Sequence, residues 1–122
     1  MPSKTVIIYI LSIFNFIIFK IKRIIKKYSR VGNIKHKGNT EEIIERLRSQ
    51  KAKYDAMEGL QTVIYVKISD SEFLGIPVWE SKEAFQNAES QVQELMSMFK
   101  DDIASPPEFK EGEIVWQYLN ES

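Results

Sequence analysis

Few side chains in this 122-residue sequence could take part in catalysis, because it contains one histidine, His36, and no cysteine. His36 is the candidate general base, since histidine is the side chain whose ordinary pKa lies near neutral pH. Its place between two lysines also fits a solvated residue at a strand end. The lack of cysteine excludes a Cys nucleophile and an iron–sulfur cluster, and a single histidine argues against a zinc site. Adjacent acids such as Asp101–Asp102 and Glu41–Glu42 fit solvated helix ends, so we predict no metal site.

Charge is divided unevenly along the chain. Residues 1–38 contain nine Lys or Arg and no acid, whereas residues 39–122 contain eight Lys or Arg and 17 Asp or Glu, which gives net charges of +9 and −9. Nucleic-acid binding depends on clustered Lys and Arg in the folded part, so we predict no nucleic-acid partner. The length corresponds to one domain, and the positive segment needs a separate explanation.

The N-terminal segment is apolar and ends in basic residues. Residues 5–19, TVIIYILSIFNFIIF, carry no charge, and five Lys or Arg follow in residues 20–27. As a helix, 15 residues cover about 22 Å of a hydrocarbon layer of about 30 Å, so spanning requires the isoleucines up to residue 25. A cleaved signal peptide fits less well, because the charges follow the apolar run.

Three interpretations of residues 1–27 therefore stay open. Residues 5–25 could be a single-pass membrane anchor, with the domain of residues 28–122 held in the cytoplasm by the basic flank. They could instead form a helix that lies in the membrane interface. In the third interpretation the segment is an artefact of start-site choice, and the protein is cytoplasmic.

Residues 28–122 are predicted to form six elements. The pattern indicates strands at residues 28–38, 60–68, 72–79 and 113–119, a helix from the N-cap Asn39 to Gly59, and a helix that begins after the N-cap Ser81. This order is the ferredoxin-like βαββαβ pattern of an α+β fold, an antiparallel four-stranded sheet with both helices on one face. Pro77 predicts an edge or a bulge in its strand. Apolar residues on both faces of the strands predict a homodimer that covers the second face.

Three segments resemble a known family. They are the helix start KGNTEEIIERL (37–47), the run VWESKEAFQNAES (78–90) after a hairpin, and the close SPPEFKEGEIVWQY (105–118). Together they resemble the antibiotic biosynthesis monooxygenase family of dimeric α+β barrels, over about residues 28–122, with Trp-Glu-Ser at 79–81 as the most specific element. The resemblance implies a small, cofactor-independent monooxygenase that binds an aromatic or quinone-like molecule. The alternative is a non-catalytic dimeric ligand-binding or assembly module whose pocket is filled by its own side chains.

The same resemblance implies which residues would line a pocket between sheet and helices. Trp79 would form an aromatic wall, although a tryptophan at a strand end is also ordinary core. The hydroxyls of Tyr54, Tyr65 and Tyr118 would hydrogen-bond a phenolic or quinone oxygen, unless these residues only fill space. Asn87 would lie at the pocket rim or face solvent.

Related members of the family bind and degrade haem, and here the match is incomplete. They use an Asn on the first strand, a Trp at the end of the third and a His in the second helix. Trp79 matches, but the expected Asn falls near Val31, and Glu89 and Ser90 stand where the His is expected. We therefore expect no haem and no other cofactor.

Overall fold

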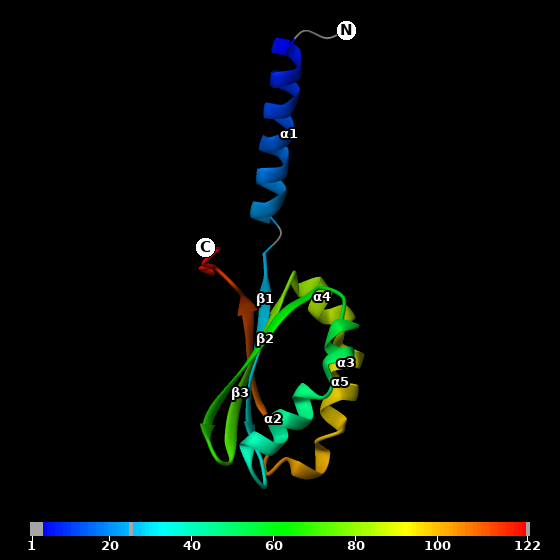
Figure 1. Ribbon diagram of the computed structural model, residues 1–122, viewed down its shortest axis with the longest axis vertical. Helices are drawn as coiled ribbons and strands as arrows, with labels where there is room; N and C mark the ends of the chain where they lie inside the picture. The colour runs from blue at the N-terminus through cyan, green and yellow to red at the C-terminus, as the bar shows by residue number, and fades with distance from the viewer. Residues whose placement is uncertain (1–3, 25, 122) are drawn as a thin grey trace.

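The computed structural model describes residues 4–24 and 26–121 and contains a helical segment followed by an α+β domain (Figure 1). A four-stranded sheet carries its helices on one face, and the N-terminal helix projects from one end of the domain. The elements are α1 (Lys4–Ile24), β1 (Tyr28–Lys35), α2 (Thr40–Arg48), α3 (Lys51–Asp55), β2 (Leu60–Ser69), β3 (Glu72–Trp79), α4 (Lys82–Asn87), α5 (Glu89–Ser97), the 3-10 turn η1 (Lys100–Asp102) and β4 (Glu108–Glu113).

The sheet has the strand order β2-β3-β1-β4, and every neighbouring pair is antiparallel. Because β1 connects through helices to β2 rather than to its own neighbour, this is the split order that the βαββαβ pattern predicts. The prediction of an α+β fold with a four-stranded antiparallel sheet is confirmed.

Pro77 lies in a central strand, so the edge alternative is wrong. Proline has no N–H to donate, and the pairing of β3 with β1 skips residues 76–78, between Gly75 and Trp79. On the other side of β3, Pro77 pairs with Val63, and the register shift lies in β2, between Leu60 and Thr62, rather than at Pro77.

Both predicted helix starts are confirmed by their caps. The Asn39 side chain accepts a hydrogen bond from the Glu41 N–H, and the Ser81 hydroxyl accepts one from the Ala84 N–H. Gly59 has φ of 86°, the left-handed conformation expected beyond a helix end.

Each predicted helix is nevertheless broken in two. The first breaks where the Ser49 hydroxyl donates to the Arg46 carbonyl and the Gln50 N–H bonds the Leu47 carbonyl, which tightens the last turn of α2. The second breaks at Ala88, whose N–H is shared between two carbonyls three and four residues before it. The first break creates the five-residue α3, which matters for the site.

The ends of two strands also differ from prediction. β1 ends at Lys35, and beyond it His36 makes only an isolated bridge with Ile103. The last strand is Glu108–Glu113 rather than 113–119, because β4 pairs with β1, and β1 begins opposite Glu113. The apolar alternation of residues 114–119 belongs to an exposed tail that includes Trp116, 79% exposed.

The core between sheet and helices consists of two groups of buried side chains. The Trp79 cluster contains Tyr28, Met57, Trp79, Phe85, Ala88 and Leu95. The Phe73 cluster contains Ile34, Ile43, Leu47, Phe73 and Phe99. Tyr54 and Met96 pack against both.

Two apolar surfaces remain exposed in the single chain. One is the β2 part of the helix-free sheet face, where Ile64 and Ile68 are 52% and 51% exposed. The other is α1, whose side chains at residues 4–18 are exposed. Among the described residues, no helix combines the length and the apolar character that a membrane crossing requires.

Candidate functional site

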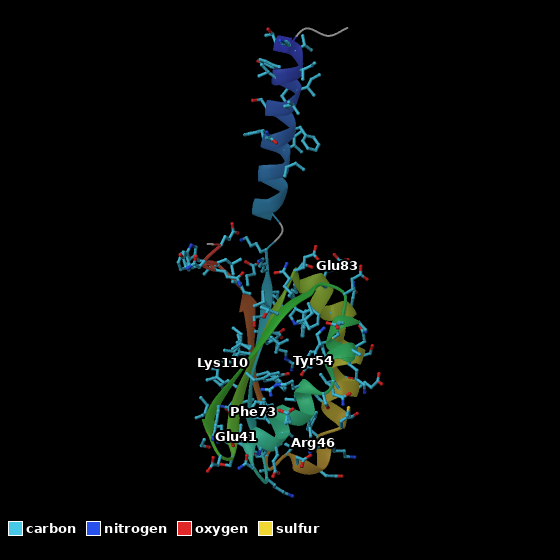
Figure 2. The ribbon with its side chains drawn as sticks, in the orientation of Figure 1. Glu41, Arg46, Tyr54, Phe73, Glu83 and Lys110 are labelled. Carbon is cyan, nitrogen blue, oxygen red and sulfur yellow. The ribbon has the colours of Figure 1, made fainter. Side chains whose placement is uncertain are left out.

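A cavity of about 330 Å³ lies between the sheet and its helices. Its lining includes members of both core clusters, so it occupies the middle of the helix-covered face, where the two clusters meet. The walls are mainly apolar and aromatic, with contributions from all four strands and from α3, α4 and α5, and Figure 2 shows the many side chains that fill this layer. A pocket of this size and character suits a small organic ligand.

Three of the predicted residues come together at this cavity. Trp79, Tyr54 and Tyr65 all line it, although they come from β3, α3 and β2. Trp79 is only 2% exposed and packs edge-on against Phe85 with 5.9 Å between ring centroids. No partner for the Trp79 Nε1–H lies among the described residues, although buried indole N–H groups usually have one.

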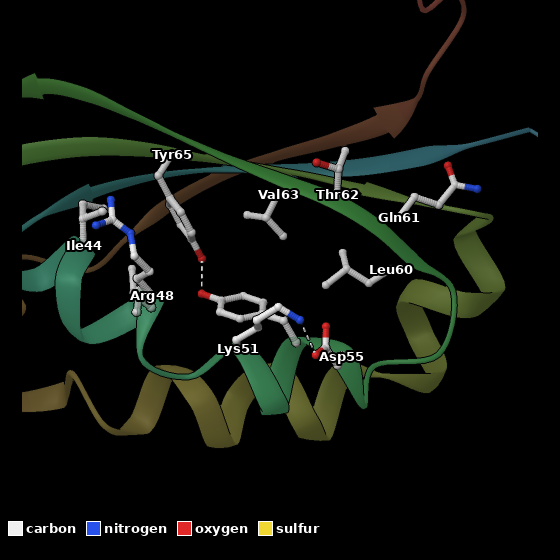
Figure 3. Close-up of a pocket in the computed structure, with 11 residues that line it drawn as sticks. Ile44, Arg48, Lys51, Asp55, Leu60, Gln61, Thr62, Val63 and Tyr65 are labelled. Atoms are coloured by element: carbon white, nitrogen blue, oxygen red, sulfur yellow. Dashed lines mark hydrogen bonds and ion pairs between the residues drawn. The ribbon is translucent and has the colours of Figure 1, made fainter. Parts of the chain in front are cut away.

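The hydroxyls of Tyr54 and Tyr65 hydrogen-bond each other. Their Oη atoms lie 2.7 Å apart, and Figure 3 shows this bond crossing from α3 to β2. Burial raises the pKa of Tyr65, and the bond with Tyr54 raises it further. Burial also raises the pKa of Tyr54, against a smaller opposing effect of the bond. Both hydroxyls therefore stay protonated at neutral pH and act as donors rather than as bases.

Sequence reasoning missed Arg30, which also lines the cavity. Its guanidinium carbon lies 4.0 Å from the Phe109 ring centroid, and no partner for its buried Nε–H occurs among the described residues. Arg30 shares the helix-covered side of β1 with Tyr28 and Ile34, and this shared parity was the available signal.

The remaining candidates lie outside the cavity lining. His36 is 3% exposed, so its interpretation as a solvated residue is wrong, and its Nε2 bonds the Thr40 hydroxyl at 2.7 Å. Tyr118 lies in the exposed tail, and Asn87 is exposed at the end of α4, as its solvent-facing alternative required. Glu89 and Ser90 begin α5 and are exposed as well.

The described lining of the cavity contains no carboxylate, imidazole or thiol. In the part of the chain that the structure describes, no three His, Cys, Asp or Glu side chains gather as a metal would require. The cavity can thus donate hydrogen bonds from Trp79, Arg30 and the two tyrosines, and it offers one fixed positive charge. It suits the oxygen atom of a flat aromatic molecule, above all an ionised one.

No family model matches the chain, and no curated protein is recognisably similar in sequence. Solved structures are similar in fold. SnoaB, a cofactor-independent oxygenase from Streptomyces nogalater, aligns with 78% of this chain and 99% of its own at a TM-score of 0.64 and 14% identity. A monooxygenase from the gene ActVA-Orf6 of Streptomyces coelicolor, in complex with Nanaomycin D, aligns with 79% and 94% at 0.63 and 16% identity.

A third structure carries the family description itself. It is a protein from Chloroflexus aurantiacus assigned as an antibiotic biosynthesis monooxygenase, which aligns with 76% of this chain and 97% of its own at a TM-score of 0.62 and 16% identity. At these identities the likeness concerns the fold, and function has to be argued from the cavity. The chain therefore contains a domain with the fold of the antibiotic biosynthesis monooxygenases.

Proposed function

We propose that the cavity binds an aromatic or quinone-like molecule and that the domain is a small monooxygenase. One observation carries the proposal: Trp79 and Arg30 line an aromatic cavity, and each has a buried N–H group, Nε1 and Nε, with no partner among the described residues. Buried donors in native proteins almost always have acceptors, and a phenolic or quinone oxygen would supply one. The similar structures include an oxygenase and a complex with Nanaomycin D, which agrees with this chemistry.

The size of the cavity separates this function from a module whose pocket is filled by its own side chains. Such a module would leave no space of a few hundred Å³ among Trp79, Tyr65 and Phe85. These three residues instead line a cavity of about 330 Å³. The space favours a ligand.

The reaction balances without a resident cofactor when the substrate supplies all the electrons. A phenol that is oxidised to a quinone by one O₂ gives up four electrons, places one oxygen atom in the ring and releases the other as water. Arg30 would stabilise the phenolate form that donates the first electron, and Trp79 would hold its oxygen.

A non-catalytic ligand-binding module is the second candidate, and one feature favours it. The described lining has no group that takes up a proton near neutral pH, since its ionisable members are Arg30, Tyr54 and Tyr65. In the oxygenase the proton of the phenol would have to leave to water. In a binding module no proton transfer is needed.

Oxidation of 1-naphthol by the full-length protein tests both candidates. The oxygenase should form 1,4-naphthoquinone and incorporate one atom of isotopically labelled O₂, and Arg30→Gln should lower the rate at least tenfold because the phenolate loses its counter-charge. Asn87→Ala, an exposed change outside the cavity, is the matched control. Binding of naphthol with no product would support the module, and neither binding nor product would reject both.

We also propose that the domain dimerises through the helix-free sheet face. The β2 side chains there, Ile64, Val66 and Ile68, are 38–52% exposed, which is unusual for three aligned apolar residues of a single chain. A second copy would cover them in a symmetric interface. Sedimentation equilibrium should give a dimer at micromolar concentration and a monomer for Ile64→Glu/Ile68→Glu, and a monomeric parent protein would contradict the proposal.

Of the three interpretations of residues 1–27, we propose the second, in which α1 lies in the membrane interface. Thr5, Ser12 and Asn15 fall on one side of the helix, because they are spaced by seven and three residues, and apolar residues occupy the other side. The basic flank would add attraction to the anionic lipids of the cytoplasmic leaflet, so the domain would lie on the cytoplasmic side. Carbonate should release the native protein from membranes; retention would indicate a span, and a fully soluble protein lacking residues 7–19 would indicate a start-site artefact.

A further inference from the structure

A second, open hollow lies directly beside the cavity. This outer groove has a volume of about 700 Å³ and runs between β2 and the helices α2 and α3 (Figure 3). Four residues, Tyr54, Leu60, Val63 and Tyr65, line both the groove and the cavity. They form the partition between the groove and the cavity.

The polar part of this partition is a single hydrogen bond. The hydroxyls of Tyr54 on α3 and Tyr65 on β2 lie 2.7 Å apart, and Figure 3 draws this bond as a dashed line from Tyr65. The rest of the partition, Leu60 and Val63, belongs to β2, which is paired along its length with β3. Only Tyr54 comes from an element outside the sheet.

The helix that carries Tyr54 is short and exposed, and Tyr54 is the side chain through which it packs against the two core clusters. α3 has five residues, none of them buried, and its N-cap residue Gln50 makes no side-chain capping bond. A helix this short has little stability of its own, and segments with few buried contacts open at low cost. A shift of α3 away from β2 would separate the two hydroxyls without disturbing the sheet.

We propose that the outer groove is the entrance to the cavity and that the Tyr54–Tyr65 hydrogen bond closes it. The inference rests on the proposed function only in assuming that a ligand enters. When the bond opens, each freed hydroxyl can bond the incoming molecule as it passes, which offsets the free energy lost with the Tyr54–Tyr65 bond. The entrance thereby favours molecules that carry oxygen atoms.

The opposite side of the cavity is the competing entrance. There Arg30 stacks on Phe109, which is 44% exposed at the edge strand β4. Both residues belong to paired strands, so only a side-chain rotation could open that side. The open groove lined by the two tyrosines and the short helix that carries Tyr54 favour an entrance on the β2 side of the cavity.

Acrylamide quenching of Trp79 tests the entrance without any ligand. Trp116→Phe leaves Trp79 as the only tryptophan, and in this background Tyr54→Phe and Tyr65→Phe should each raise the quenching rate constant about two- to tenfold, as expected for loss of one hydrogen bond. The double variant should equal either single variant, because both remove the same bond. Tyr118→Phe, which removes a hydroxyl from the exposed tail, is the matched control and should change nothing.

Stopped-flow binding of 1,4-naphthoquinone gives the second readout. A closure slows entry and exit alike, so Tyr54→Phe should raise both rate constants and change Kd less than twofold. Unaltered acrylamide quenching in both tyrosine variants would overturn the entrance, whether or not the quinone binds. So would faster quenching in Phe109→Leu alone, or a weaker Kd with an unaltered association rate, which would make the tyrosines ligand contacts. Failure of the quinone to bind, with the quenching result as expected, would count against the proposed function and leave the entrance supported.

Discussion

Buried polar groups are hydrogen-bonded at one end of the helix-covered sheet face and lack partners among the described residues at the other. At the end of β1, the His36 Nε2 bonds the Thr40 hydroxyl, and this hydroxyl donates to the Ser69 carbonyl at 2.8 Å. Near the start of β1, the Trp79 Nε1–H and the Arg30 Nε–H have no partner among the described residues. A satisfied buried group stabilises a fold, whereas an unsatisfied one costs stability and is kept where a ligand completes it.

The His36 end is thus a structural joint. It connects the end of β1, the first residue of α2 and the hairpin between β2 and β3 through side chains, in addition to the backbone bond from the His36 N–H to the Ser71 carbonyl. The Trp79 end lines the cavity instead. Variants at each end should therefore separate stability from binding.

The largest effect is expected for His36→Ala. The substitution leaves a hole in a buried site and removes the bond to Thr40, so the free energy of unfolding should fall by about 2–4 kcal/mol. Naphthoquinone affinity of the folded protein should stay within twofold. Urea unfolding followed by circular dichroism gives the first quantity and calorimetric titration the second. A stable variant that no longer binds ligand would mean that the joint belongs to the site.

Trp79→Phe should instead affect ligand affinity more than stability. Phenylalanine retains an aromatic wall but lacks the N–H, so quinone affinity should fall about tenfold, which corresponds to roughly 1.4 kcal/mol. Because Nε1 has no partner among the described residues, the stability loss should be limited to packing. Isothermal calorimetry in parallel with urea unfolding measures both. Affinity that is unchanged would place the ligand oxygen elsewhere.

Arg30→Gln should affect the binding of a charged ligand more than that of an uncharged one. Arg30 is the only cation in the described lining of the cavity, so an ionised naphthol should lose about three- to tenfold in affinity while the uncharged quinone loses little. The bound naphthol should also ionise at a higher pH in the variant. Absorbance titration of the bound ligand follows this directly, and equal losses for both ligands would rule out a charge effect.

The smallest effect is expected at the surface of the His36 end. Hydrogen bonding from Lys67 lowers the pKa of Glu41 below its ordinary 4.5. A lowered pKa in the folded state means that the pair contributes fully above about pH 4.5, and that the contribution is lost as the pH falls through the folded value. Glu41→Gln should flatten the acid limb of the stability curve slightly, with Glu42→Gln as control, because exposed pairs contribute little. An unchanged acid limb would contradict the coupling.

The sequence was sufficient wherever local chemistry decides structure. Asn39 and Ser81 cap their helices because their side chains bond the nearby backbone, and the β-branched run from Leu60 pairs with the next strand across a short turn. The last strand was misplaced because its polar residues, Glu108–Glu113, pair with β1 from the far end of the chain. Only the three-dimensional register could choose them over the more apolar residues that follow.

The site was predicted in part for the same reason. Trp79 and Tyr65 carry visible strand patterns, and the resemblance placed them in a pocket. Arg30 resembled a solvated charge on a strand, and His36 resembled one more polar residue between lysines. Whether such residues are buried depends on what the helices cover, and for Arg30 the one sequence signal was the strand face that it shares with Tyr28 and Ile34.

Gly59 decides how α3 could move. Its φ of 86° is costly for other residues, a Cβ there would lie 2.5 Å from the Ala84 Cβ, and its carbonyl accepts a hydrogen bond from the Glu80 N–H at 2.7 Å. The chain just beyond α3 is therefore fixed against the start of α4. Before α3, the Gln50 N–H bonds the Leu47 carbonyl of α2. Movement of α3 is therefore confined to the residues between Gln50 and Gly59, and a shift that breaks the bond of Tyr54 leaves the strand at Leu60 in place.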